Sequence, residues 1–296
     1  MSEIKIAEST LPGRILRHPM SLLVIGFIVF VVLYGLTGAA AGSVKALRNT
    51  PAQTAITLGC AAIGVLVYKA FQRWIERRED AEFALAGAGK ELGAGLLFGF
   101  LLFSVMVGIV ALLGGFGIDG LRGTGRLWSM LAMSIASGLY EEVIFRGIVF
   151  RQIEAMAGSW VALALTSAFF GAAHLANPGA TFFAAFAIAM EAGILLGGAY
   201  MFTRRLWLAV GIHAAWNFTQ GWVFSAPVSG GKAPDGLFFT HRAGPDWLTG
   251  GAFGLEASVV AMVVATGAGM VMLVLAARAG RVMPMSFRKA RESGQR

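Results

Sequence analysis

Long apolar runs separated by short polar stretches dominate this sequence. About 20 apolar residues are enough for a helix to cross the hydrocarbon core of a bilayer. By that measure the pattern predicts eight spans, over residues 21–42, 52–71, 92–118, 127–157, 160–177, 181–203, 206–224 and 255–277. The fourth run is longer than one span needs, and the fifth is short. The predicted fold class is all-α: a polytopic transmembrane helix bundle of about eight spans.

The order of the runs predicts four parts of the chain. Residues 1–120 hold N-terminal transmembrane helices, 121–224 a second group of helices, 225–254 a non-cytoplasmic loop, and 255–296 the last helix with a basic tail. The loop is rich in Gly and Pro and lacks periodicity, which predicts disorder or a solvent cap, with a lid over a site as the alternative. The first run is too long for the apolar part of a signal peptide, so it is kept as a span.

Composition supports a membrane protein. The chain is 57% hydrophobic and 14% charged, whereas soluble domains are roughly 25% charged. Its 40 glycines suit the close helix packing found in lipid. The single cysteine, Cys60, excludes an intrachain disulfide and is expected to be a small buried hydrophobe.

The distribution of the basic residues behind the net charge of +8 predicts the membrane topology and argues against a nucleic-acid partner. The basic residues flank the apolar runs and form no stripe interleaved with aromatics. With eight spans both termini share one side, and the excess of Lys and Arg on that side predicts that it is cytoplasmic. That side collects Lys5, Arg14, Arg17, Lys69, Arg73, Arg77, Arg78, Lys90, Arg151, Arg204, Arg205, Arg278, Arg281, Arg288, Lys289, Arg291 and Arg296, against Lys45, Arg48, Arg122, Arg126, Lys232 and Arg242.

Ionisable residues inside the fourth run are the first candidates for chemistry, because such residues are costly in a membrane and functional by default. At 3.6 residues per turn, Glu142 and Arg146 share a helix face and can form an ion pair. Glu141 is turned about 100° away and stays free for other work. In the alternative interpretation, all three lie at the cytoplasmic helix end and only anchor it at the interface.

Two later runs add polar side chains. His174 ends the fifth run, and His213 and Asn217 lie four apart on one face of the seventh. A lone histidine is more often a packing residue, but here two histidines accompany the glutamates. A carboxylate in a low-dielectric pocket is a stronger general base, and an imidazole with a carboxamide can donate to an oxyanion. Glu191, in the middle of the sixth run, is either a packing residue or a supporting group that tunes a neighbour.

The cofactor is left open: none, or a single divalent metal such as zinc. Glu141, His174 and His213 are an acceptable ligand set for a catalytic zinc with an open position. The His-Glu-x-x-His spacing of zincins is absent. Since no serine or cysteine lies beside a histidine, water is the natural nucleophile.

Three motifs in order carry a family resemblance. Glu141-Glu142-x-x-x-Arg146, Phe170-x-x-x-His174 and His213-x-x-x-Asn217 resemble the CPBP family, which comprises type 2 CAAX prenyl endopeptidases and Abi or bacteriocin-processing relatives. The good match spans about residues 127–223, and the resemblance implies that residues 121–224 are a CPBP-like catalytic core. The resemblance implies that Glu141 activates a water with help from His174. It also implies that His213 and Asn217 stabilise an oxyanion, with Glu142, Arg146 and Phe170 in support. Family members are described with and without a metal.

The resemblance implies an intramembrane endopeptidase in a bacterial cell membrane. Its partners would be the bilayer and a membrane-associated peptide or protein, cleaved in a CAAX-type, peptide-maturation or immunity role. Two alternatives stay open: a non-catalytic membrane scaffold or partner protein of the same fold, and an ion-coupled transporter that uses Glu141, Glu191 and His213 as a relay. The lack of an inverted repeat counts against the transporter.

Overall fold

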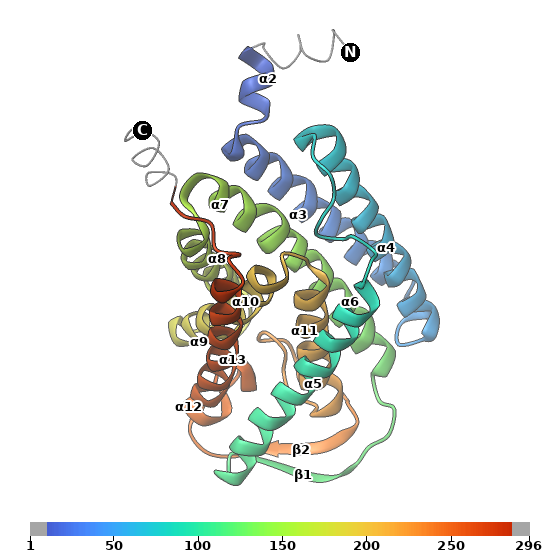
Figure 1. Cartoon of the computed structure of the whole chain (residues 1–296). Coiled ribbons are helices and arrows are strands. Elements are labelled where there is room, and N and C mark those ends of the chain that lie inside the picture. The colour runs from blue at the N-terminus through green and yellow to red at the C-terminus, as the bar shows by residue number, and fades with distance from the viewer. Residues whose placement is uncertain (1–10, 286–296) are drawn as a thin grey trace.

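The computed structural model describes residues 11–285, and the apolar runs fold into one helix bundle (Figure 1). Its helical elements are α2 Leu11–Leu16, α3 Pro19–Ser43, η1 Lys45–Leu47, α4 Pro51–Ala70, η2 Phe71–Glu76, α5 Ala88–Leu112, α6 Leu127–Glu142, η3 Val143–Phe150, α7 Arg151–Ala157, α8 Ser159–Ala173, η4 His174–Ala176, α9 Phe182–Ile188, η5 Ala189–Gly193, α10 Ile194–Thr203, α11 Trp207–Phe218, η6 Thr219–Val223, α12 Asp246–Thr249, η7 Leu255–Ala257 and α13 Val259–Arg278. Segments η2, η3, η5 and η6 are π-helical. The predicted all-α polytopic class is confirmed.

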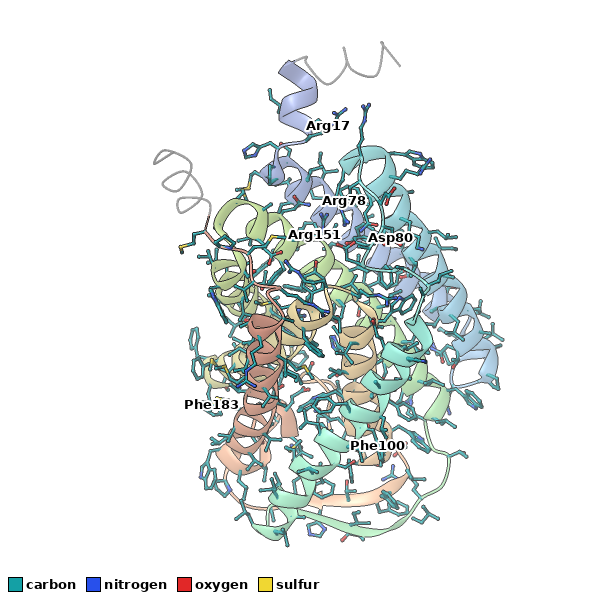
Figure 2. The ribbon with its side chains drawn as sticks, viewed as in Figure 1. Arg17, Arg78, Asp80, Phe100, Arg151 and Phe183 are labelled. Carbon is teal, nitrogen blue, oxygen red and sulfur yellow. The ribbon has the colours of Figure 1, made fainter. Side chains whose placement is uncertain are left out.

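Six helical segments of the described chain are long and apolar enough to cross a membrane: Pro19–Ser43, Pro51–Glu76, Ala88–Leu112, Ser159–Ala176, Phe182–Thr203 and Val259–Arg278. The two other predicted spans are also helical. One carries the charged residues of α6, η3 and α7, and the other has twelve α-helical and five π-helical residues. The number of eight membrane spans therefore stays a prediction. Apolar side chains such as Phe100 and Phe183 face outward from the bundle (Figure 2).

Two predicted boundaries are wrong. Helix α5 ends at Leu112, because the following Gly114 adopts a left-handed backbone (φ 78°), and residues 116–118 enter a strand instead. The last helix starts at Val259 because the Ser258 side chain caps it by accepting a hydrogen bond from the Ala261 N–H. The pattern of apolar residues alone reveals neither the left-handed glycine nor the serine cap.

The segment 225–254 is folded, so the prediction of disorder is wrong. Its strand β2 (Phe238–Arg242) pairs antiparallel with β1 (Phe116–Leu121). This two-stranded sheet lies at the end of the bundle opposite α2 (Figure 1). The Gly230 N–H also donates to the Phe253 carbonyl, and these backbone bonds hold a segment whose Gly and Pro content suggested a mobile loop.

Close helix contacts position the polar residues of the bundle. A Cβ added at Gly138 of α6 would lie 2.9 Å from atoms of Ala214 on α11. A Cβ at Gly95 of α5 would lie 2.4 Å from the Leu208 carbonyl oxygen on the other side of α11. These glycines let α5 and α6 approach α11 backbone to backbone. The polar side chains of α6 and α11 thereby come within hydrogen-bonding reach.

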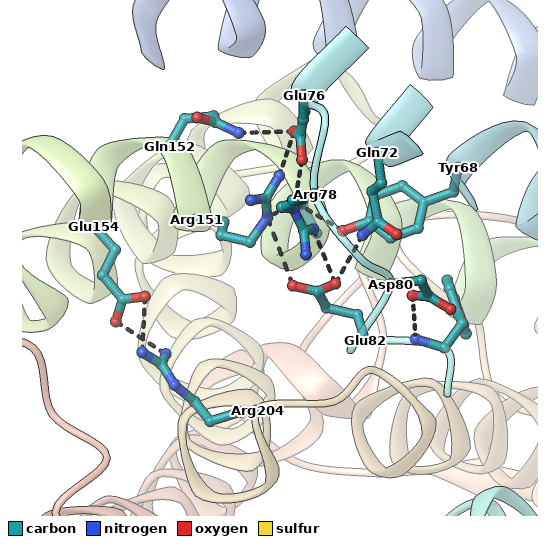
Figure 3. Close-up of polar contacts among 12 residues, drawn as sticks. Tyr68, Gln72, Glu76, Arg78, Asp80, Glu82, Arg151, Gln152, Glu154 and Arg204 are labelled. Atoms are coloured by element: carbon teal, nitrogen blue, oxygen red, sulfur yellow. Dashed lines mark hydrogen bonds and ion pairs between the residues drawn. The ribbon is translucent and has the colours of Figure 1, made fainter. Parts of the chain in front are cut away.

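A partly buried ionic cluster at the α2 end contacts α7 (Figure 3). Arg78 donates to Glu76 at 2.6 Å and to Glu82 at 2.9 Å, and Gln72 donates to Glu82 at 2.7 Å. Arg151 of α7 pairs with Glu76, to which Gln152 also donates at 2.9 Å. We call Glu76, Arg78, Glu82 and Arg151 the ionic cluster; it ties the 77–87 connection to α7.

The charge distribution agrees in part with the predicted topology. Arg17, Arg78 and Arg151, which the sequence assigns to one side of the membrane, all lie toward the α2 end of the bundle (Figure 2). Arg122, directly after β1, and Arg242 of β2 belong to the opposite end, where the two strands lie. Lys5 and the tail from Arg288 lie outside the described residues. A cytoplasmic location of the termini stays a prediction.

Candidate active site

Glu142 and Arg146 form the ion pair that their spacing predicts. Arg146 Nη1 donates to Glu142 Oε1 at 2.9 Å. Both residues are at most 1% exposed, so they lie inside the bundle and not on its surface. Arg146 Nη2 also donates to the Ala192 carbonyl at 3.0 Å, and the guanidinium carbon lies 5.0 Å from the Phe170 ring centre. The pair lies where α6 passes into the π-helical segment η3, a kind of distortion common at functional sites.

Glu142 also orients His213. Nδ1 of His213 lies 2.9 Å from Glu142 Oε1, the oxygen that Arg146 contacts. An ionised carboxylate only accepts hydrogen bonds, so Nδ1 carries the proton. The ring therefore points Nε2 toward Glu141, whose Oε2 lies 3.8 Å away. Glu142 thus joins α6 to α11 and fixes the direction of the second imidazole nitrogen.

His174 follows α8 in a single 3₁₀ turn, before Pro178 and the left-handed Gly179 end the helical path. Its Nδ1 lies 2.7 Å from the Phe170 carbonyl oxygen. A carbonyl only accepts, so Nδ1 is the donor and the neutral ring keeps a lone pair on Nε2. The Phe170 ring lies 4.7 Å from the His174 ring and 6.2 Å from the His213 ring, between the two imidazoles.

Asn217 is held by a serine that the sequence analysis missed. Asn217 Nδ2 donates to Ser137 Oγ at 2.9 Å, and the Ser137 hydroxyl can donate in turn to the Ser134 carbonyl at 3.4 Å. Ser137 lies one helical turn before Glu141, and this i,i+4 spacing on a charged helix is the only sequence signal that could have found it. The second N–H of the Asn217 amide can donate elsewhere.

One cavity of about 300 Å³ collects the four predicted catalytic residues. Its lining includes Glu141, His174, His213 and Asn217, together with Tyr34, Ser137, Lys232 and neighbouring residues of the 228–234 segment. The Glu141 side chain is 21% exposed, in contrast to the buried Glu142. The two adjacent glutamates therefore face different surroundings, as the helical rotation between them predicts.

The comparison with family models supports the resemblance. Residues 123–219 match the model described as type II CAAX prenyl endopeptidase, Rce1-like. Over this segment the chain is similar to that family. No curated protein and no solved structure matched the chain.

The family assignment and the helices together define the molecule at a coarse level. It is an integral multi-pass membrane protein whose residues 123–219 are similar to CAAX-type intramembrane proteases. The matched segment contains Glu141, Glu142, Arg146, Phe170, His174, Glu191, His213 and Asn217. It leaves out the first three long helices, although Tyr34 of α3 lines the cavity.

Glu191 lies beside the two histidines, in a different cavity from Glu141. It is 1% exposed in the π-helical segment η5 and lines a second, smaller cavity of about 30 Å³ beside His174 and His213. Its Oε2 has no hydrogen-bond partner among the described residues. Glu256, which the sequence analysis missed, lines the same cavity and accepts a hydrogen bond from the Ser229 N–H. Burial raises the pKa of Glu256 to about 7.

The residues proposed as zinc ligands do not converge on one point. Among residues 11–285, no three His, Cys, Asp or Glu side chains are grouped so that they could hold a metal ion. Glu141, His174 and His213 therefore do not fit a three-ligand site as they stand, and no step is derived through a metal.

Proposed function

We propose that this protein is an intramembrane endopeptidase that hydrolyses a peptide bond in a membrane-associated peptide or protein with a water activated by Glu141. One observation carries the proposal: Glu141 and His174 share the wall of a 300 Å³ cavity with the donors His213 and Asn217. A base and oxyanion donors around one space are the parts that hydrolysis requires.

Glu141 acts as the general base. Its partly exposed carboxylate takes a proton from a water in the cavity while the oxygen of that water attacks the substrate carbonyl carbon. Nε2 of His174, with its lone pair free, accepts a hydrogen bond from the same water and orients it. The protonated Glu141 then gives its proton to the leaving nitrogen as the carbon–nitrogen bond breaks, which yields a carboxylic acid and an amine.

His213 and Asn217 stabilise the oxygen that becomes negative in the tetrahedral intermediate. Asn217 uses the amide N–H that does not bind Ser137. His213 donates from Nε2 in its imidazolium form, in which Nδ1–H stays bound to Glu142. Arg146 neutralises the charge of Glu142, so that this carboxylate holds the ring without leaving an unpaired buried charge. Preorganised donors of this kind are worth about 10²–10³ in rate each.

Glu191 supports this chemistry from the second cavity. Its carboxyl group lies beside both histidines but outside the cavity that contains Glu141. We therefore assign it a tuning role on the histidines. Replacing Glu191 with Gln is expected to change the pH profile of cleavage more than the maximal rate. An unchanged profile would remove Glu191 from the mechanism.

The substrate is a segment that reaches into the bilayer. CAAX-type processing, maturation of a small peptide and self-immunity in a bacterial cell membrane are the settings in which such a peptidase would work. Lys232 lies exposed at the cavity wall on the 228–234 segment and gives this entrance a positive charge.

A cleavage assay tests the proposal. Purified protein in liposomes is given a library of membrane-anchored peptides, with and without chelator, beside Glu141→Gln and His213→Ala. Cleavage that both substitutions abolish supports the peptidase. Glu79→Gln, an exposed glutamate outside the site, is the matched control and should cleave normally. Absence of cleavage of every peptide by the unmodified protein would favour a non-catalytic scaffold of the same fold.

A further inference from the structure

The first long helix reaches the catalytic cavity although it lies outside the family segment. Tyr34 of α3 lines the cavity, and its hydroxyl donates to Glu141 Oε1 at 3.4 Å. This distance is long for a hydrogen bond between oxygens, and such contacts often shorten when substrate fills the site. Tyr34 and Glu141 are 107 positions apart in the sequence.

The Tyr34 ring is held in place from behind. It stacks on the Tyr140 ring, with centroids 5.3 Å apart and planes inclined by 13°. Tyr140 is 1% exposed, and its hydroxyl donates to the Cys60 carbonyl of α4 at 2.7 Å. Gly64 of the same helix leaves room for the Tyr140 ring, since a Cβ there would lie 2.8 Å from it. Helix α4 therefore fixes the Tyr140 ring, and the Tyr140 ring in turn limits where the Tyr34 ring and its hydroxyl can lie.

We propose that Tyr34 is a positioning residue for the general base Glu141, which makes α3 part of the catalytic unit. This inference rests on the proposed function. The Tyr34 hydroxyl holds Oε1, and Oε2 is thereby directed toward His213 Nε2, 3.8 Å away, and toward the attacking water. A glutamate side chain has several rotatable bonds, so a donor on one oxygen reduces the number of unproductive orientations.

Other charged and titratable groups also face Glu141. They are His213 from α11, His174 from the turn after α8, Lys232 from the 228–234 segment, and the Glu142–Arg146 pair on its own helix. Tyr34 differs from these because it is a neutral donor that contacts a carboxylate oxygen directly. Its removal withdraws one hydrogen bond and leaves the charges of the site unchanged.

The stacked tyrosines supply a matched pair of variants. Tyr34→Phe removes the hydroxyl next to Glu141, whereas Tyr140→Phe removes the hydroxyl bound to the Cys60 carbonyl and keeps the same aromatic stack. In the cleavage assay, Tyr34→Phe is expected to lower kcat about tenfold, the effect of losing a hydrogen bond to a charged group. It should also move the acid limb of the pH–rate profile to higher pH, with KM nearly unchanged. Tyr140→Phe should leave the acid limb in place.

Two outcomes would overturn the inference. Tyr34→Phe could leave both kcat and the acid limb unchanged, or the two variants could move the limb equally, as a general loosening of the helices would. A double-mutant cycle adds a sharper criterion: in a Glu141→Gln background, Tyr34→Phe should have no further effect on residual cleavage.

A second measurement works even if no peptide is cleaved. Infrared titration of the purified protein follows the carboxyl band that disappears in Glu141→Gln. The titration midpoint of this band should rise in Tyr34→Phe and stay constant in Tyr140→Phe. A midpoint that does not move in Tyr34→Phe contradicts the positioning role. Lack of cleavage with a shifted midpoint would contradict only the peptidase function.

Discussion

Glu142 accepts a hydrogen bond from Nδ1 of His213 at 2.9 Å, and the same carboxylate oxygen binds Arg146 at the same distance. The carboxylate is fully buried, so the cation and the imidazole are what make its charge tolerable. The second glutamate of the pair thus organises the site, while the first, Glu141, faces the cavity.

Replacing Glu142 with Gln should damage both stability and cleavage. The substitution leaves the buried Arg146 charge without its partner, which costs about 3–5 kcal/mol when a buried pair is broken. It also frees the His213 ring. We expect a clear fall in the thermal unfolding temperature and at least a 100-fold loss of kcat, measured on the same detergent-purified sample. A variant as stable as the unmodified protein would show that the pair carries no structural role.

Replacing Glu141 with Gln should separate activity from stability. The Glu141 side chain is 21% exposed, and its polar contacts with Tyr34 and His213 are long, at 3.4 Å and 3.8 Å. We therefore expect cleavage to fall by about 10³-fold or more, because the base is lost. The unfolding temperature should change by no more than about 2 °C, as for most substitutions of weakly bound groups. Retention of cleavage would assign the base to another residue.

Substitution of Asn217 should lower kcat more than substitution of Ser137. Asn217→Ala removes an oxyanion donor and is expected to lower kcat by about 10²–10³ with KM nearly unchanged. Ser137→Ala keeps the amide but removes the oxygen that holds it, so a loss of roughly tenfold is expected. Steady-state kinetics of both variants check the order. If Ser137→Ala were the more severe change, the serine would have a direct role in the reaction.

Glu256 predicts a pH dependence of stability. Its pKa is raised by burial from 4.5 to about 7, against hydrogen bonds from Ser229 and Gln220 and the charge of His213, which lower it. The folded protein therefore holds this proton more tightly than the unfolded chain. The resulting stabilisation is fully present below pH 4.5 and is lost as the pH rises through 7.

The Glu256→Gln variant isolates this effect, because an amide cannot titrate. Unfolding temperatures of both proteins are measured from pH 5 to about 8. The unmodified protein should lose stability relative to the variant over that range. Since Glu191 faces Glu256 across the same cavity and is coupled to it electrostatically, the double variant with Glu191→Gln is the control for the neighbouring carboxyl group. A difference that is constant with pH would contradict the assignment.

Chelation should leave cleavage unchanged within about twofold. The reason is the arrangement of side chains: within the described part of the chain, Glu141, His174 and His213 are not grouped as a three-ligand metal site. Dialysis against a chelator, followed by metal analysis and assay, checks this. Loss of cleavage that zinc restores would mean that the side chains rearrange around a metal.

The sequence predicted relationships within one helix better than relationships between helices. Spacing along α6 was enough to pair Glu142 with Arg146 and to turn Glu141 away from them. The contact between Glu142 and His213 spans 71 positions, and no periodicity encodes it. The resemblance brought both residues to one site but left Glu142 only a supporting role.

Tyr34 shows the same limit more strongly. Its helix is uniformly apolar, and a tyrosine in such a run is ordinary at a membrane interface. Only the packing of α3 against α6 gives its hydroxyl a catalytic neighbour. Likewise, the two-stranded sheet of β1 and β2 depends on pairing between residues more than 100 positions apart, which local composition cannot reveal.

The ionic cluster has a consequence for which bonds can be cut. Arg151, its member on α7, lies ten residues after Glu141 on a continuous helical path, which would be about 15 Å long if it were α-helical throughout and is somewhat shorter because η3 is π-helical. Half the hydrocarbon thickness of a bilayer is about the same length. We expect the charges of the cluster to lie at the water boundary. Under the proposed mechanism, Glu141 then meets a scissile bond that enters the hydrocarbon layer, and not one that stays among the lipid headgroups.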